Sequence, residues 1–228
     1  MKKLNLLLFM VLAVVAGAYA QEETRSFNVK DFEKLSMGSA FKINLKQGKN
    51  FRVVATGQRR DLDDLEAKVS GGKLSIRYKE NGRNRKGVHF EIEMPELSGI
   101  DLSGAASMKA GKFNTRGNFD LDVSGAAKLE LELDAETVDF DLSGASSTEL
   151  SGRANSLRGD ISGASSLRAG KFPVKEVEID ASGASSASVQ ASARLSGDAS
   201  GASSIRYSGG AKEIRVNSSG GSSIRRSE

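Results

Sequence analysis

Hydrophobic and polar residues alternate along most of the chain, and a short Ser-Gly-Ala motif interrupts this alternation at regular steps of 21, 19, 19, 20, 18 and 19 residues. A step of this length without a helix-length apolar pattern predicts a solenoid, in which each repeat adds one layer to a shared core. The motif occurs seven times, with glycine in place of alanine in the last copy: Ser103-Gly104-Ala105, Ser124-Gly125-Ala126, Ser143-Gly144-Ala145, Ser162-Gly163-Ala164, Ser182-Gly183-Ala184, Ser200-Gly201-Ala202 and Ser219-Gly220-Gly221.

Each repeat carries two segments with the period of a β-strand. Apolar residues stand five, three and one positions before the serine, as in Phe119, Leu121 and Val123, and a second, largely apolar column begins five positions after it. A period of two predicts strands, hinged at the motif and stacked in parallel about 4.8 Å apart. The sequence therefore predicts an all-β, single-domain parallel β-helix of about 19 residues per coil. Because steps of 18 to 21 residues do not divide into hexapeptides, we favour the right-handed kind.

The glycine of each motif is predicted to form the structural hinge between the two strands. A sharp corner needs a positive φ or a close approach of neighbouring backbones, and glycine accepts both at low energetic cost. We expect the alanine after it to face the confined interior of the corner. The hinge glycines are Gly104, Gly125, Gly144, Gly163, Gly183, Gly201 and Gly220.

An acidic column stands two residues before each motif serine, and strand parity points it out of the core. Stacked carboxylates repel one another, so a partner must offset the charge. We favour local capping, in which each carboxylate accepts hydrogen bonds from the corner, because an amide such as Asn217 can do the same. The alternative is a ladder of Ca²⁺ sites, although one column offers few ligands per ion. The column comprises Asp101, Asp122, Asp141, Asp160, Asp180, Asp198 and then Asn217.

Residues 1–20 have the pattern of a secretory signal peptide. Lys2 and Lys3 precede the apolar run 6–12, and Ala18-Tyr19-Ala20 makes an A-x-A cleavage site before polar residues. No later segment is apolar enough to predict a transmembrane anchor, and the absence of cysteine excludes disulfides and a lipidated cysteine. The sequence predicts export to the periplasm, the extracellular space or the cell surface.

The rest of the chain is divided by its pattern into segments. We expect an N-terminal lead at 21–31, then a β-helix domain over 32–220, and a tail at 221–228. Within the domain, residues 32–97 lack the motif but alternate like strands, which predicts irregular N-terminal layers that close the end of the stack, and 98–220 form the regular coils. The polar loop from Lys79 to Gly87 is expected to be solvated.

Composition argues against several functional classes. Without Lys2 and Lys3 the formal charge of +4 becomes +2, and the basic residues are dispersed, so nucleic acid is not an expected partner. Catalytic residues, cofactors and zinc are not predicted, because cysteine is absent, the repeated serines lack a base, and the sole histidine, His89, lies on a predicted strand as a surface residue.

The signal peptide, the strand-rich lead, the step Met94-Pro95-Glu96-Leu97 and the repeated pattern of alternating residues before Ser-Gly-Ala-Ser-Ser carry a family resemblance. Over roughly residues 32–220, the sequence resembles the exported bacterial family called putative auto-transporter adhesin, head GIN domain. The resemblance implies a β-helical fold and a role in surface adhesion.

Two classes of function are compatible with these patterns. A repeated surface without a singular site favours a non-enzymatic envelope protein that binds a glycan, an envelope component or another protein. The alternatives are a polysaccharide-active β-helix enzyme, which rests on analogy of fold, and a calcium-binding structural solenoid. The sequence indicates neither the identity of the ligand nor the oligomeric state.

Overall fold

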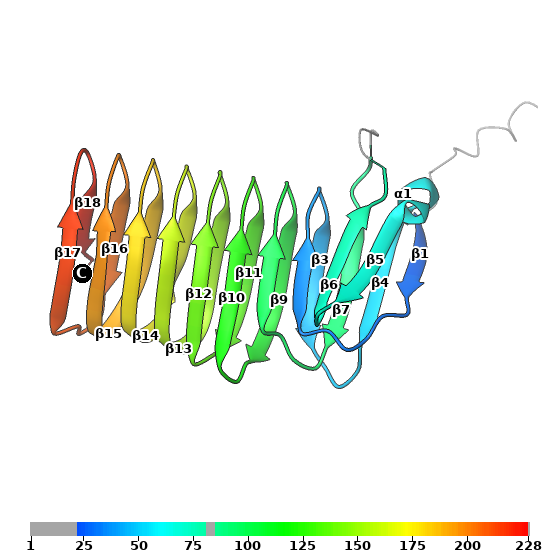
Figure 1. Cartoon of the computed structure of the whole chain (residues 1–228), viewed down its shortest axis with the longest axis horizontal. Helices are drawn as coiled ribbons and strands as arrows, with labels where there is room; N and C mark the ends of the chain where they lie inside the picture. The colour runs from blue at the N-terminus through cyan, green and yellow to red at the C-terminus, as the bar shows by residue number, and fades with distance from the viewer. Residues whose placement is uncertain (1–21, 81–84, 228) are drawn as a thin grey trace, which may run out of the picture.

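The computed structural model describes residues 22–80 and 85–227, which form an elongated stack of flattened coils (Figure 1). The predicted single-domain parallel β-helix is confirmed, because successive coils pair in parallel on two faces. The predicted signal peptide lies outside the described residues. In each coil, one strand leads into the Ser-Gly-Ala corner and the next leads away from it. We call these two sides of the stack the approach face and the return face.

The strands of the two faces follow one another along the stack. The approach face contains β6 (Lys73–Tyr78), β2 (Lys34–Met37), β8 (Gly99–Leu102), β10 (Asn118–Val123), β12 (Thr137–Leu142), the second halves of β13 (Ser147–Ile161), β14 (Ser166–Ala181) and β15 (Ser186–Ala199), and β17 (Glu213–Ser218). The return face contains β7 (His89–Met94), β3 (Lys42–Gln47), β9 (Ser107–Asn114), β11 (Lys128–Asp134), the first halves of β13 to β15, β16 (Ser204–Ser208) and β18 (Ser223–Arg226).

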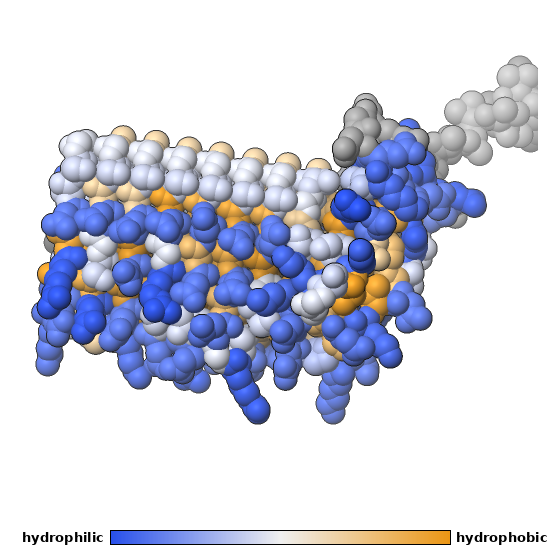
Figure 2. All heavy atoms as spheres, in the orientation of Figure 1, coloured by the Kyte–Doolittle hydropathy of each residue, from blue (hydrophilic) through white to orange (hydrophobic). Residues whose placement is uncertain are grey.

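The register stacks equivalent residues of successive repeats. Asp122 pairs with Asp101 on one side and with Asp141 on the other. The differences in repeat length are absorbed away from the corners, at β-bulges such as the one between Glu149 and Ser151. The corners therefore stay aligned along one edge of the stack, where their small residues form a continuous pale row (Figure 2).

Each corner is held by backbone hydrogen bonds that the amides of its first and third residues donate to the coil before it. The hinge glycines have φ between 67° and 75°. The amide of Ala145 donates to the carbonyl of Gly125 at 2.7 Å, and the same bond recurs in the neighbouring coils. A Cβ built on Gly144 would lie 2.6 Å from that carbonyl oxygen. Glycine is thus required twice, once for the positive φ and once for the space.

The alanine after the hinge glycine does not face the interior, in contrast to our expectation. Ala126 is exposed, and the next residue, Ala127, is the one that is buried. In the five later coils this position is a serine, which is buried in all but the last coil. The hydroxyl of Ser165 donates to the carbonyls of Ser162 at 2.6 Å and Leu142 at 3.1 Å. Ser185, Ser203 and Ser222 also donate to a carbonyl of the coil before them, whereas the buried hydroxyl of Ser146 makes no hydrogen bond with the described residues.

The N-terminal layers are not stacked in chain order. β2 lies between β6 and β8, and β3 lies between β7 and β9. The coil of residues 34–47 is thus enclosed by two coils that come later in the sequence. The connection through Pro95 and Leu97 passes the base of this coil, where the amide of Ser98 donates to the carbonyl of Glu33 at 2.7 Å. Leu97 is 1% exposed and anchors the crossing.

This enclosed coil has a corner without the Ser-Gly-Ala motif. Gly38-Ser39-Ala40 lies in register before Ser103-Gly104-Ala105, and the amide of Ala105 donates to the carbonyl of Ser39 at 2.6 Å. Ser39 has a φ of 61°, so a serine adopts the conformation that glycine adopts elsewhere. The regular row of corners therefore begins one coil earlier than the sequence indicated.

Antiparallel strands close the N-terminal end of the stack. β5 (Leu65–Ser70) pairs with β6, β4 (Arg52–Gln58) pairs with β7, and β1 (Glu22–Phe27), which lies within the expected lead, pairs with β4. The short helix α1 (Arg59–Asp63) joins β4 to β5.

The expected solvated loop is partly buried. Arg85 forms an ion pair with the buried Asp64, and its guanidinium lies 3.6 Å from the centroid of the Tyr78 ring. This contact ties the end of the loop to α1 and β6.

The C-terminal coil includes part of the expected tail. β18 lies within residues 221–228 and pairs with β16, so ordered stacking extends to Arg226. The other strand of this coil, β17, carries Ile214, which is 42% exposed, whereas the corresponding Leu195 in β15 is buried. The last layer covers its apolar residues less completely than the layers before it.

Three alanine substitutions separate the two roles of glycine. Gly144→Ala puts a side chain on a residue with positive φ and brings its Cβ against the Gly125 carbonyl, so we expect the free energy of unfolding to fall by about 2–4 kcal/mol. Gly117→Ala keeps the positive φ but has no atom within 4 Å of the new Cβ, so a loss of about 1–2 kcal/mol is expected. Gly210→Ala meets neither constraint and should stay within about 0.5 kcal/mol of the wild type.

Urea denaturation of the three variants measures these differences. Equal losses for Gly144→Ala and Gly117→Ala would contradict the steric role of the stacked glycine carbonyls.

Candidate functional site

The acidic column forms a straight row on the outer side of the approach face. Its register continues beyond the aspartates at both ends, to Ser36 and Ser75 on the N-terminal side and to Asn217 on the C-terminal side. The stack thus presents one outward polar side chain per coil at this position. We call the six aspartates of this column the acidic row: Asp101, Asp122, Asp141, Asp160, Asp180 and Asp198.

The corners do not cap the acidic row in the way that we favoured from the sequence. The amide of Ser124 donates to the carbonyl of Leu102, and that of Ala126 to the carbonyl of Gly104, so both amides are used between coils. The hydrogen bonds of the row run along it instead. Ser36 Oγ donates to Asp101 at 2.9 Å, and Asn217 Nδ2 donates to Asp198 at 2.8 Å. The two ends of the row are therefore bonded to neutral neighbours.

The middle of the row shows the electrostatic consequence of stacking. Loss of hydration raises the pKa of Asp122 above its ordinary value, and the charges of Asp101 and Asp141 raise it further, while Lys73 opposes the shift. The folded state thus disfavours the ionised carboxylate at Asp122.

The side chain of Lys34 extends over the approach face because the neighbouring residue in the register is a glycine. Gly99 stands between Lys34 and Asp120 in the register, and Lys34 Nζ lies 2.7 Å from the Asp120 carboxylate. A Cβ built on Gly99 would come within 3.4 Å of the Lys34 side chain. The hydrogen bond to Asp120 raises the pKa of Lys34. Lys34 therefore places a positive charge over the N-terminal part of the approach face.

The geometry offers no catalytic arrangement on this face. Within residues 22–80 and 85–227, no group of three or more histidine, cysteine or acidic side chains is placed to hold a metal ion. His89 is exposed on β7 in register with Lys42, in agreement with the predicted surface position. Asp122 has a raised pKa, but it stands on an exposed strand and not in a cleft that could hold a substrate. The hinge glycines lie at the corners and offer only backbone groups.

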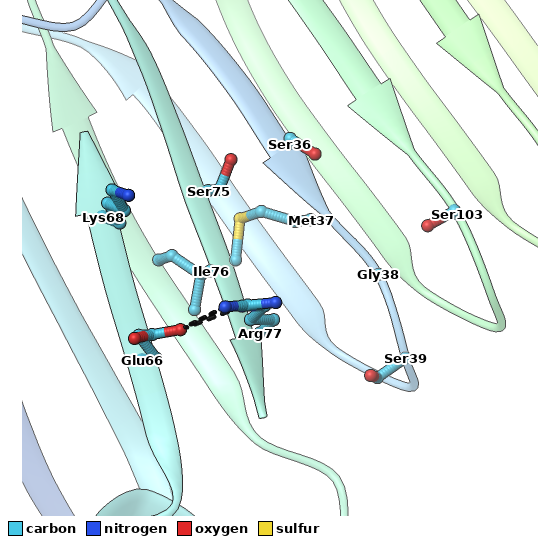
Figure 3. A pocket seen from close by; sticks show the side chains of 10 residues that line it. All are labelled: Ser36, Met37, Gly38, Ser39, Glu66, Lys68, Ser75, Ile76, Arg77 and Ser103. Atoms are coloured by element: carbon cyan, nitrogen blue, oxygen red, sulfur yellow. Dashed lines mark hydrogen bonds and ion pairs between the residues drawn. The ribbon is translucent and has the colours of Figure 1, made fainter. Parts of the chain in front are cut away.

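A concave site lies at the N-terminal end of the acidic row. The row of corners ends at Ser39, because β6 and β7 are joined by a longer loop instead of a corner. A hollow of about 500 Å³ opens beside this end (Figure 3). We call it the corner hollow. It is lined by Ser36, Met37, Gly38, Ser39, Glu66, Lys68, Ser75, Ile76, Arg77 and Ser103.

The charged groups of the corner hollow are only partly paired. Arg77 on β6 donates to Glu66 on β5 at 2.8 Å through Nη2 and at 2.9 Å through Nε, both to the oxygen Oε2. Lys68 is exposed on β5, and no ion pair with the rest of the described chain holds it. Hydroxyls and one unpaired ammonium therefore surround the hollow.

No sequence pattern indicated the corner hollow. Its residues come from three segments, 36–39, 66–77 and Ser103, which meet only because β2 lies between β6 and β8. The stacking of β6 on β2 had no local signal in the sequence.

The fold and these surfaces define a parallel β-solenoid with a rigid, repetitive polar exterior. The chain matches, over residues 31–211, the family described as putative auto-transporter adhesin, head GIN domain, and it belongs to that family. No protein with a curated function matches the chain in sequence.

Several solved structures share this fold. A putative adhesin from Bacteroides fragilis has 20% identity and a TM-score of 0.85, over 91% of this chain and 97% of its own. A putative lipid binding protein from Parabacteroides distasonis has 18% identity and a TM-score of 0.72, over 92% and 98%. A putative adhesin from Parabacteroides merdae has 17% identity and a TM-score of 0.71, over the same shares. At these identities the likeness establishes the fold.

The raised pKa of Asp122 gives a prediction about stability. A carboxyl group whose pKa is raised on folding stabilises the protein below its unfolded pKa, and this contribution is lost as the pH rises through the folded pKa. Asp122→Asn should therefore leave the melting temperature unchanged near pH 3 and raise it by about 1–3 °C at pH 7.

Calorimetry between pH 3 and 8 tests this expectation, with Glu132→Gln on the return face as the matched control. A lower melting temperature for Asp122→Asn at pH 7 would contradict repulsion within the row. A calcium-dependent rise that Asp122→Asn abolishes would instead show that the row holds the ion.

Proposed function

We propose that this protein is an exported, non-catalytic binding module that attaches to a glycan or protein of the bacterial envelope through its approach face. The observation that carries the proposal is the unbroken polar column from Ser75 to Asn217, which ends in the corner hollow. A solenoid holds such columns on a rigid scaffold, so a long partner meets a similar side chain in every coil.

The energetics of the acidic row support an external role. The pKa of Asp122 is raised in the folded state, and among the described residues side-chain hydrogen bonds are made at Asp101, Asp180 and Asp198 but not at Asp122, so an acidic residue in every coil is not explained by stability alone. Residues that oppose stability without a local compensating contact often belong to functional surfaces.

Membership of the adhesin family supports the same role, and so does the pattern of an exported protein at residues 1–20. In the described structure no helix is long and apolar enough to cross a membrane.

A lipid partner, suggested by the description of the Parabacteroides distasonis protein, receives less support from this surface. Among the described residues, Ile214 is the one large hydrophobic side chain that is exposed. A protein that takes up an acyl chain needs an apolar groove or cavity, and the core of this solenoid is filled by its own side chains.

Sedimentation of the purified protein with isolated bacterial envelopes tests the proposed function. We expect binding that the double variant Asp122→Asn and Asp141→Asn reduces at least about threefold. The matched control is Glu130→Gln with Glu149→Gln, two carboxylates stacked in register on the return face.

Two outcomes would overturn the proposal. The first is no binding to envelopes or to a glycan array. The second is turnover of a polysaccharide by the purified protein, which would make it an enzyme.

A further inference from the structure

The corner hollow differs from the two faces of the stack in shape and in the origin of its residues. It is concave, and three segments distant in sequence converge on it, whereas the two faces are built of repeated columns. Its size falls within the range of about 300–1,000 Å³ that is typical of small-molecule sites. This place is therefore suited to hold one unit of a ligand in a fixed orientation.

The hydrogen-bonding state of each group restricts what the hollow can bind. The proton of Ser36 is committed to Asp101, so toward a ligand its hydroxyl can only accept. Glu66 receives both bonds from Arg77 on Oε2, which leaves Oε1 as a second acceptor. These two acceptors suit a ligand that carries hydroxyl donors.

The remaining groups suit an anion. Lys68 has three N–H donors on an ammonium that no carboxylate of the described chain neutralises, and Arg77 adds a second positive charge on the neighbouring strand. Ser75 and Ser103 can donate or accept, since no described hydrogen bond uses their hydroxyls. A charge-assisted bond from Lys68 is the strongest contact that the hollow offers.

We propose that the corner hollow binds an acidic sugar, whose carboxylate or sulfate lies on Lys68 while its hydroxyls donate to Ser36 and Glu66. Inorganic phosphate alone uses only the donors, and it meets the repulsion of the Glu66 carboxylate. A neutral sugar leaves Lys68 without a counter-charge. An acidic sugar satisfies both sets of groups.

This inference rests on the proposed function, because it names the ligand class of the same face. The acidic row next to the hollow repels the rest of a polyanion, so the hollow is suited to a terminal or isolated acidic unit of an envelope glycan. Ser36, which contacts Asp101 and also lines the hollow, is the point where the two surfaces meet.

The test is direct titration of the purified protein with defined oligosaccharides. The probes are an otherwise neutral oligosaccharide with one terminal uronic acid for the carboxylate, the same type of oligosaccharide with one terminal sulfate, maltohexaose as the neutral sugar, and inorganic phosphate. At least one acidic probe should bind about tenfold or more tightly than maltohexaose and phosphate at low salt, and binding should weaken as salt is added. The two acidic probes distinguish carboxylate from sulfate.

Matched variants locate the site. Lys68→Glu should weaken the acidic probe by at least about tenfold, whereas Lys128→Glu, an exposed lysine on the return face, should leave it unchanged. Ser75→Val removes one hydroxyl and should weaken binding severalfold, and its melting temperature checks that the fold is kept. Equal affinities for Lys68→Glu and Lys128→Glu would overturn the assignment, as would failure of both acidic probes to bind.

The envelope experiment separates this inference from the proposed function. If envelopes bind the wild type and Lys68→Glu equally and no acidic probe binds, the hollow is not the site, while the binding role of the protein stands. If nothing binds in either experiment, both proposals fail.

Discussion

One short contact, repeated in every coil, constrains the whole structure: the amide after each hinge glycine donates to the carbonyl of the hinge glycine one coil earlier. The bond of 2.7 Å between Ala145 and Gly125 places a carbonyl oxygen where any Cβ on Gly144 would have to lie. Because this contact aligns the corners, the strands on either side take one register, and the acidic row follows from that register. The differences in repeat length are left to the bulges near the base.

The regular coils could be predicted because local and global preferences agree there. The alternation around Phe119, Leu121 and Val123 gives the strand, and the glycine two residues later gives the corner. The prediction that the alanine after the hinge glycine faces the interior was wrong. The chain turns inward one residue later, because the corner is tighter than a simple bend. The capping hypothesis failed for a related reason, since backbone groups of the adjacent coil already use the corner amides.

The candidate site was largely beyond sequence reasoning. The outward direction of the Asp122 side chain follows from the local alternation and could be predicted from the sequence. Its raised pKa could not, because it depends in part on carboxylates in two other coils. The corner hollow depends on the position of β2 between β6 and β8, which links residues about 40 to 65 positions apart. No periodic pattern in the sequence indicates that β2 lies between these two strands. The extra corner at Gly38-Ser39-Ala40 was also not recognised, because it has serine where the other coils have glycine.

The enclosed coil also bears on how the chain reaches its final form. Residues 34–47 are synthesised before both of the coils that cover them, so during synthesis β2 and β3 have no parallel partner until residues 73–94 and then 99–114 have followed. Pairings of such large sequence separation form late, because a long loop must close first. The N-terminal part therefore cannot serve as a finished template for the repeats. Instead, the first regular coil completes the N-terminal layers, and the two parts of the molecule become ordered together.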